Sequence, residues 1–141
     1  MALLQVDIVS AEGEIHRGEA AMVFAPAEMG EVGIAPRHAP LLTRLRPGTV
    51  RVKTPEGETL QFFVGGGILE VQPRLVTILA DTALRAKDAD EAAAQKAKQD
   101  AEAALASATT EMDLAKAQAL VVEAAARLEF VRKLRTTVHG G

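Results

Sequence analysis

Cysteine is absent from the 141-residue sequence. Its absence excludes disulfide bonds, thiolate nucleophiles and thiolate metal ligands, and it suits a protein of a reducing compartment. Tryptophan and tyrosine are also missing, and only four phenylalanines are present. Because the net charge is −3, the chain offers neither the basic field nor the aromatic platforms that nucleic-acid binding needs. We therefore expect no nucleic acid among its partners.

Long apolar runs are missing as well. No uninterrupted run approaches the roughly 18–20 residues that span a bilayer. The N-terminal stretch carries the acidic residues Asp7, Glu12 and Glu14 in place of the basic flank and cleavage site of a signal peptide. We expect neither a signal peptide nor direct insertion into a membrane.

Residue patterns that carry catalysis are also lacking. His16, His38 and His139 are far apart in sequence and lack metal-site spacing, although folding could still bring two of them together. Residues 65–67 are three glycines, but no Lys-Ser/Thr follows them and the next segment is typical of a strand. These glycines favour a bulge or tight turn over a phosphate loop. We predict no catalytic residue, no metal site and no cofactor.

Glycine and proline are unevenly distributed. Both recur between Gly13 and Pro73 and then disappear until Gly140. Because they punctuate turns and interrupt helices, the front part is predicted to be rich in β-strands and the rest helical. We expect an N-terminal domain over residues 1–86 and a two-helix domain over residues 87–141.

The front part shows short alternating segments typical of a β sandwich or barrel. The clearest is Leu4, Val6 and Ile8, which alternate with polar residues. The best-defined turn is Thr54-Pro55-Glu56-Gly57, which predicts a hairpin between residues 49–53 and 58–64. Further strands are expected at residues 14–17, 20–25, 33–35, 42–45, 68–71 and 75–80.

The rear part predicts two antiparallel helices. Asp88 is the expected N-cap of the first, which should end near Ala106, and the polar stretch Ser107, Thr109 and Thr110 precedes the second. The facing positions are expected to be Ala93, Ala97, Ala101, Ala104 and Leu105 on the first helix, and Leu114, Ala117, Val121, Ala124, Leu128, Val131 and Val138 on the second. Because alanine buries little apolar area, this contact should be reversible.

The end of the second helix is basic, with Arg127, Arg132, Lys133 and Arg135. Cations near a helix C-terminus complement the helix dipole, which is one explanation. A basic face suited to an acidic partner surface is the other. Two i,i+4 pairs, Glu123 with Arg127 and Glu129 with Lys133, should support the helix.

Three segments together carry a resemblance: LLQVDIVSAEGEIHRGEA, GEVGIAPRHAPLLTRLRPGTVRV and GGGILEVQPRLVTILADTALRAKDADEA. They closely resemble the epsilon-subunit family of bacterial F-type (rotary) ATP synthases, over residues 3 to about 91. The resemblance implies a β sandwich of about ten short strands followed by a C-terminal α-helical hairpin. It implies a non-catalytic rotor subunit of the central stalk, which couples ion flow through the c ring to ATP synthesis through the gamma subunit.

The resemblance also implies roles for individual residues. The loop at residues 30–33 and the nearby His38 match family loops that face the c ring, with Glu31 and His38 as the contacts. The helices of this family can extend to the beta subunit and restrain ATP hydrolysis, so Arg127, Arg132, Lys133 and Arg135 are the residues expected there. The implied location is peripheral, on the cytoplasmic side of the bacterial inner membrane.

The chain departs from the family at one motif. Some members bind regulatory ATP through Ile-Asp-x-x-Arg-Ala, where this chain has Ala89-Asp90-Glu91-Ala92-Ala93-Ala94. The arginine that would pair with phosphate is missing, so Asp90 is a weak remnant and we expect very weak or no ATP binding. A different class of function is a free-standing β-sandwich binding module with a dimerising helical hairpin.

Overall fold

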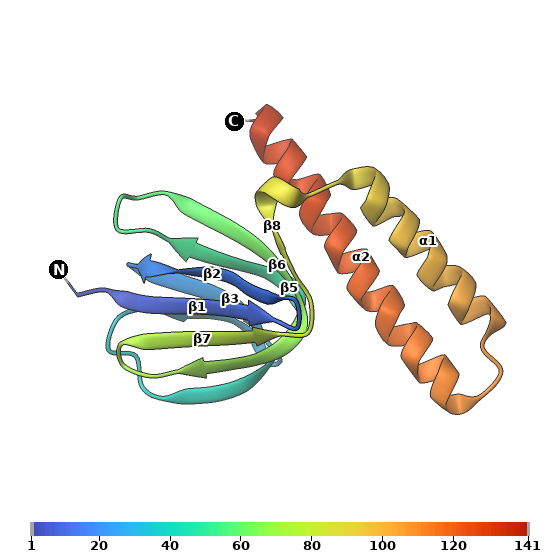
Figure 1. The fold of residues 1–141 in the computed structure, drawn as a ribbon, viewed down its shortest axis with the longest axis horizontal. Helices are drawn as coiled ribbons and strands as arrows, with labels where there is room; N and C mark the ends of the chain where they lie inside the picture. The colour runs from blue at the N-terminus through green and yellow to red at the C-terminus, as the bar shows by residue number, and fades with distance from the viewer. Residues whose placement is uncertain (1, 141) are drawn as a thin grey trace. The chain divides into compact units, whose positions relative to one another are not determined.

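The computed structural model describes the backbone of residues 2–140 and the side chains of residues 2–134. The chain divides into two compact units, Met1–Lys87 and Asp88–Gly141. The first contains the strands and the second contains the two α-helices (Figure 1). Each unit is described by itself below.

The first unit is a β sandwich, as predicted. Its strands are β1 (Leu4–Ser10), β2 (Gly13–Ala20), β3 (Met22–Ala27), β4 (Gly30–Ile34), β5 (Leu41–Lys53), β6 (Thr59–Val71), β7 (Leu75–Ala80) and β8 (Ala83–Arg85). They form one hydrogen-bonded path in the order β2-β1-β7-β6-β5-β3-β4, with β8 also paired to β6. All neighbours are antiparallel except β1 and β7.

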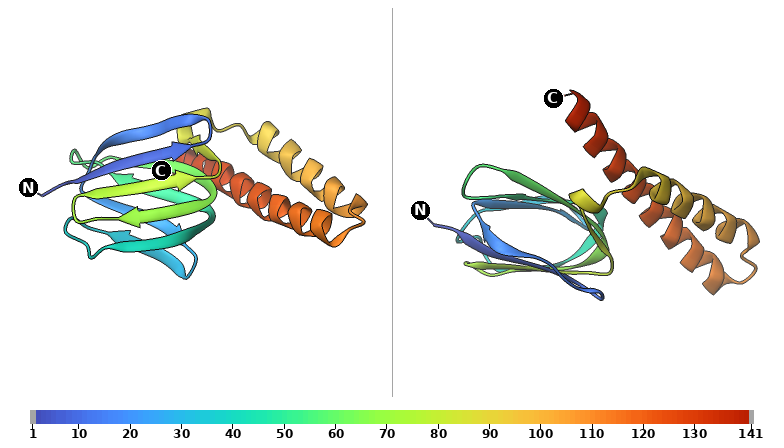
Figure 2. Two further views of the ribbon diagram at one scale, coloured as in Figure 1. Left: turned by 60° about the horizontal axis from the view of Figure 1, so that its bottom comes forward. Right: turned by 45° about the horizontal axis from the view of Figure 1, so that its top comes forward.

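The path folds into two layers because β5 and β6 each pass through both (Figure 2). The second half of β6 pairs with β7, whereas its first half pairs with β8. The sequence predicted separate strands on either side of residues 46–48 and 65–67, and about ten strands in total. The described residues contain eight continuous strands, since the proline and glycines at these positions bend two long strands without ending them.

Gly67 is where β6 bends closest to β7. Its φ is +137°, a conformation that side chains rarely adopt, and a Cβ built there would lie 2.1 Å from the carbonyl oxygen of Leu79. Gly67 therefore serves a close backbone approach within a strand. The predicted bulge or tight turn is replaced by this bend.

The core lies between the two layers and is filled by the inward-facing residues of the strands. Its fully buried large members include Leu4, Val6, Ile8, Val23, Ile34, Val50, Val52, Val64, Leu69, Val71 and Ile78. Burying each such side chain contributes about 1.5–3 kcal/mol, so this core supplies most of the driving force for folding of the unit.

The predicted hairpin at Thr54 is confirmed. Gly57 N donates to Thr54 O at 3.0 Å, Thr54 N donates to Glu58 O at 2.9 Å, and Lys53 pairs with Thr59. The Thr54 hydroxyl also accepts from Glu58 N at 3.1 Å. The turn thereby sets the register of β5 against β6.

The second unit is the predicted helical hairpin, formed by α1 (Glu91–Ser107) and α2 (Glu111–Gly140). The predicted N-cap, Asp88, is wrong, because Ala86–Asp88 forms a short 3₁₀ turn and the helix begins later. Asp90 is the cap instead, and its carboxylate accepts from Ala93 N at 3.2 Å. Thr110 caps α2 in the same way through Asp113 N at 3.1 Å.

The two helices pack along alanines, but not along all of those predicted. Ala94, Ala101, Ala117 and Ala124 are buried at seven-residue spacing on each helix. Ala93, Ala104 and Leu114 are exposed, contrary to the prediction, because the buried stripe of α1 runs through Ala94. Val138 lies outside the described side chains. Ala97, Leu105 and Val121 are half-buried, and Leu128 and Val131 are buried.

Candidate interaction surfaces

Glu31 lies on strand β4, not in the loop that the sequence predicted at residues 30–33. Its Oε1 accepts from Arg51 Nη2 at 2.9 Å, and the Arg51 guanidinium lies 4.4 Å from the centroid of the Phe24 ring. The three residues come from β4, β5 and β3, which are neighbours in the same layer. Glu31 therefore belongs to a polar cluster on the sheet surface, with both charged side chains open to solvent.

His38 lies in the connection between β4 and β5. His38 N donates to Ala35 O at 3.1 Å, and its ring Nδ1 lies 2.7 Å from Ala39 O. The preceding residue, Arg37, has a φ of +68° and donates its backbone N–H to Pro73 O at 2.9 Å. These bonds fix the connection beside the turn between β6 and β7.

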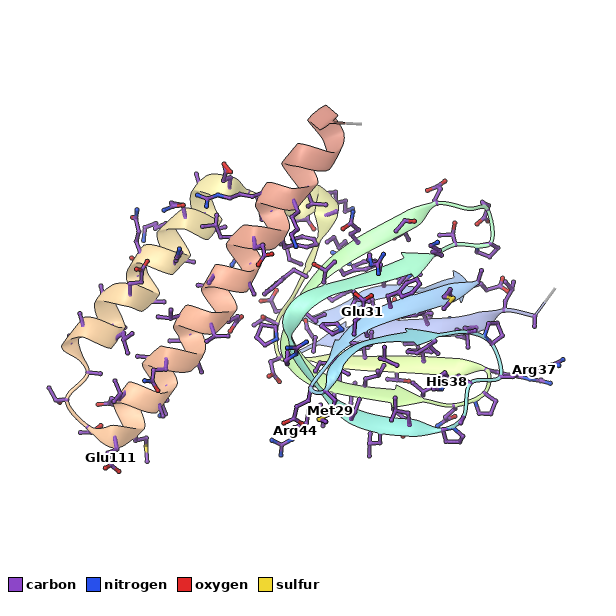
Figure 3. The ribbon with its side chains drawn as sticks, turned by 180° about the vertical axis from the view of Figure 1, so that it is seen from behind. Met29, Glu31, Arg37, His38, Arg44 and Glu111 are labelled. Atoms are coloured by element: carbon purple, nitrogen blue, oxygen red, sulfur yellow. The ribbon has the colours of Figure 1, made fainter. Side chains whose placement is uncertain are left out.

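Figure 3 shows that Glu31 and His38 are not brought together. His38 and Arg37 lie at one end of the sandwich, while Met29 and Arg44 lie at the other, with Glu31 on the strand that joins the two ends. Met29, in the turn between β3 and β4, is 95% exposed. The two sequence-predicted contact residues thus belong to different parts of the surface.

An exposed apolar patch, which the sequence analysis did not identify, lies on the outer face of β5, β6 and β7. It consists of Leu42, Ile68 and Leu79, which we call the apolar strip. Ile68 is directly opposite Leu79 on β7 and opposite Arg44 on β5, and Leu42 is two residues from Arg44. The alternation of inward-facing and outward-facing residues along each strand could have identified these three residues. They face outward and are leucine or isoleucine, whereas polar residues are usual on a solvated sheet face.

The basic residues of α2 are partly engaged within the hairpin. Arg132 Nη2 donates to Gln95 Oε1 at 2.9 Å, and its Nε lies 3.7 Å from Glu91 Oε1, so Arg132 joins α2 to the first turns of α1. Lys133 pairs with Glu129 along α2 at 2.8 Å, as predicted. The side chain of Arg135 lies outside the described residues.

Arg127 lines a groove of about 370 Å³ between the two helices. The other lining residues include Ala97, Ala101 and Ala124, whose small side chains leave the groove open. The Nε of Arg127 is buried and has no hydrogen-bond partner within the described part of the chain. This Nε–H donor is therefore available to an acceptor that enters the groove, whose lining also includes the acidic Asp100 and Glu123.

Two further residues that the sequence analysis considered for binding, Asp90 and His16, have structural roles. Asp90 caps α1, which accounts for an acid at that position. His16 packs against Phe62 with 5.0 Å between ring centroids, and its pKa is lowered, first by burial and then by the nearby Arg85, while Asp7 and Glu14 oppose the shift. Among the described residues no group of three histidine or acidic side chains could hold a metal ion. His139 lies outside the described side chains.

In the described part of the chain, no helix combines the length and the apolar character needed to cross a membrane.

The family model of the ATP synthase delta/epsilon chain β-sandwich domain matches residues 3–86. This range covers all eight strands. The chain belongs to the ATP synthase delta/epsilon family. Individual relatives match over nearly the whole chain, the helices included. The ATP synthase epsilon chain of Stenotrophomonas maltophilia (strain K279a) is 56% identical over 138 residues, which are 98% of this chain and 99% of that one.

Two more relatives carry the same name. The epsilon chain of Nitrosococcus oceani is 59% identical over 132 residues, covering 94% of each chain. The epsilon chain 1 of Methylococcus capsulatus is 60% identical over 132 residues, again covering 94% of each.

Solved structures share the fold at low identity. A chain of the Euglena gracilis mitochondrial ATP synthase matches with a TM-score of 0.75 and 20% identity, over 89% of this chain and 79% of that one. A chain from the central stalk and c-ring structure of the Tetrahymena thermophila mitochondrial enzyme matches with a TM-score of 0.57 and 17% identity, over 95% of both chains.

Proposed function

We propose that this protein is a non-catalytic rotor subunit in the central stalk of an F-type ATP synthase. It couples ion flow through the c ring to ATP synthesis in the catalytic head through the gamma subunit. The observation that carries the proposal is the similarity to epsilon chains along nearly the whole sequence, 56% over 98% of the chain.

The apolar strip is the surface best suited to gamma. Leu42 is 70% exposed and Leu79 is 52% exposed, which is costly for leucines on a solvated sheet face. Contiguous exposed apolar side chains with charged neighbours, here Arg44 and Glu70, are typical of protein–protein interfaces. Docking on gamma would remove this surface from water.

We assign the contacts with the c ring to Glu31 and His38. Because these residues lie on different parts of the sandwich, they cannot form one small contact patch and would make separate contacts. Glu31 would exchange its bond with Arg51 for one with the partner, at little cost because both side chains are exposed.

We assign the regulation of ATP hydrolysis to the helical hairpin. At about 1.5 Å per residue, α2 with its 30 residues reaches about 45 Å when it separates from α1. Separation breaks the exposed bonds of Arg132 to Gln95 and Glu91 and exposes the alanine stripe, and each of these costs little. The larger cost is exposing Leu128 and Val131, which are also buried. Arg127, Arg132, Lys133 and Arg135 would then meet an acidic surface of the beta subunit and restrain ATP hydrolysis.

The location follows from assembly with these partners. The protein would sit peripherally on the cytoplasmic side of the bacterial inner membrane, held by gamma and the c ring. No cofactor is proposed, and Asp90 is assigned to capping α1 and not to ATP.

The deciding experiment measures ATP hydrolysis by the catalytic head with gamma, adding either the full chain or a version that ends after Lys87. Both should co-purify with gamma, and only the full chain should inhibit. If neither binds gamma, the stalk assignment is wrong. If both bind and hydrolysis is the same with either, the regulatory role is wrong while the stalk role survives.

The free-standing binding module remains the second candidate. The observation that favours it is the exposed Leu120 and Val122 on α2, which could support self-association. Light scattering of the isolated chain separates the two, because a persistent dimer favours the module and a monomer favours the stalk subunit.

A further inference from the structure

A polar hollow is lined in part by Arg37. Figure 3 shows that Arg37 lies at the end of the sandwich opposite to Met29 and Arg44. Its volume is about 570 Å³, and its lining residues are Ala2, Leu3, Glu19, Pro36, Arg37, Pro73 and Arg74. The hydrogen bond from Arg37 N to Pro73 O, 2.9 Å long, joins the β4–β5 connection to the β6–β7 turn and brings the two arginines to one hollow. None of these residues belongs to the apolar strip or to the helical hairpin.

The two guanidinium groups have no protein acceptor in the described part of the chain, which sets them apart from most other arginines of the sandwich. Arg46 donates to Ala27 O, Arg51 to Glu31, and Arg85 to Ile15 O, each within about 3 Å. Each free guanidinium presents five N–H donors in a planar fork that matches phosphate oxygens. A pair of such forks beside one hollow is suited to an anion with several oxygens.

The backbone conformation of Arg37 also favours a binding role for its side chain. Its φ of +68° lies in the left-handed region, which is strained for a residue with a side chain and unstrained for glycine. Arginine thus occupies a position that glycine would fill at lower energy, and what the chain gains from it is a side chain at the rim of the hollow.

Glu19 limits what the hollow can bind. Its carboxylate is the acidic group among the lining residues and offsets one of the two positive charges. Apolar lining from Leu3, Pro36 and Pro73 lies beside the charged groups. The lining as a whole therefore stays positively charged, with apolar surface beside it for the rest of a phosphorylated molecule.

We propose that this hollow binds a phosphate group, held by Arg37 and Arg74. The phosphate could come from an anionic phospholipid headgroup or from a free phosphorylated small molecule, because both present the same oxygens. The hollow adjoins His38, one of the two residues assigned to the c ring, but it shares no lining residue with the surfaces assigned to gamma, the c ring or the beta subunit. Because the isolated chain is used to measure phosphate binding, the two proposals can fail independently.

Titration calorimetry of the full chain with pyrophosphate tests the free-phosphate source, and co-sedimentation with phosphatidylcholine vesicles, with and without phosphatidylglycerol, tests the lipid source. Arg37→Gly removes a guanidinium while relieving the backbone, so the variant stays folded. Both variants, Arg37→Gly and Arg74→Gln, should weaken phosphate binding about 10- to 100-fold. Glu19→Gln should tighten binding.

Arg44→Ala is the matched control, since Arg44 is an exposed arginine at the opposite end of the sandwich. It should leave binding unchanged. Pyrophosphate binding without vesicle binding identifies a free ligand, and vesicle binding that requires phosphatidylglycerol identifies a headgroup. The proposal is overturned if neither probe binds, or if Arg44→Ala weakens binding as much as Arg37→Gly does.

Discussion

Arg51 holds Glu31 at 2.9 Å while its guanidinium lies over the ring of Phe24. Arg51 thereby joins three strands of one layer, β3, β4 and β5, through an ion pair and a cation–π contact. The carboxylate assigned to the c ring is thus positioned on a rigid sheet surface before any partner arrives.

Replacing Glu31 with glutamine should change the free energy of unfolding by no more than about 1 kcal/mol, because exposed ion pairs contribute little. Any larger loss of c-ring association therefore reports a partner contact. Urea denaturation and co-purification with the c ring measure the two effects. Glu28→Gln, in the adjacent turn, is the control and should leave association intact. A variant of Glu31 that assembles normally would remove this residue from the proposed contact.

Gly67→Ala should destabilise the sandwich by more than about 4 kcal/mol, because the new Cβ would lie 2.1 Å from Leu79 O. Gly57→Ala is the matched control. Gly57 also has a positive φ, +92°, but no atom lies within 4 Å of its Cβ position, so only about 1–2 kcal/mol should be lost. Thermal unfolding of both variants gives the comparison, and equal losses would show that the β6–β7 approach is not as close as described.

His16 should make stability depend on pH. Its folded-state pKa lies below the usual 6.5, chiefly because burial disfavours the charged ring. The unfolded chain then binds more protons between the two pKa values, so stability is complete above pH 6.5 and falls as the pH drops toward the folded-state pKa. Denaturation of the protein and of His16→Gln should show a smaller acid-induced loss in the variant. Parallel losses would mean that carboxylates account for the whole effect.

Leu79→Gln and Leu42→Gln should leave stability within about 0.5 kcal/mol, because both side chains are already exposed. The same variants should weaken association with gamma if the apolar strip is the docking surface. Met112→Gln is the control, since Met112 is an exposed apolar residue of α2 outside the strip. Pull-down with gamma should separate the strip variants from the control, and unchanged binding by both strip variants would relocate the interface.

Arg132→Gln should favour separation of the hairpin, because it removes the contacts with Gln95 and Glu91 that join α2 to α1. The shift should be about 1 kcal/mol or less. Lys133→Gln is the control, because the described partner of Lys133 lies on α2 itself. The native chain has no cysteine, so a pair of introduced cysteines can carry distance labels on the two helices without background. Equal distances in both variants would show that Arg132 does not hold the hairpin closed.

The sequence predicted the sandwich, the hairpin at Thr54 and the pair of helices, because alternation, turn residues and helical spacing are local signals. The sequence predicted β5 and β6 as two strands each, because proline and glycine occur both where a strand ends in a turn and where a long strand bends and continues. Only the hydrogen bonds of the neighbouring strands distinguish the two cases, and these are contributed by residues far away in sequence.

The candidate contacts were predicted less well for a related reason. Glu31 was expected in a loop because glycines flank it at positions 30 and 33, yet those glycines lie within β4 opposite β3. Arg132 was predicted as a basic surface residue, and its contact with Gln95 depends on how α1 and α2 pack. Alternation could identify each outward-facing residue of the apolar strip, but it could not show that the three lie together, because they come from three strands.

The passage of β5 and β6 through both layers has a mechanical consequence. In a sandwich built from separate sheets, a sideways load on one sheet reaches the other only through side-chain packing, which can slide. Here two covalent backbones cross between the layers, each 13 residues long, so the layers cannot shear past each other without changing the backbone dihedral angles and the inter-strand hydrogen bonds of both strands. A part that turns with a shaft needs this torsional stiffness, because any slack within it would delay the transfer of torque.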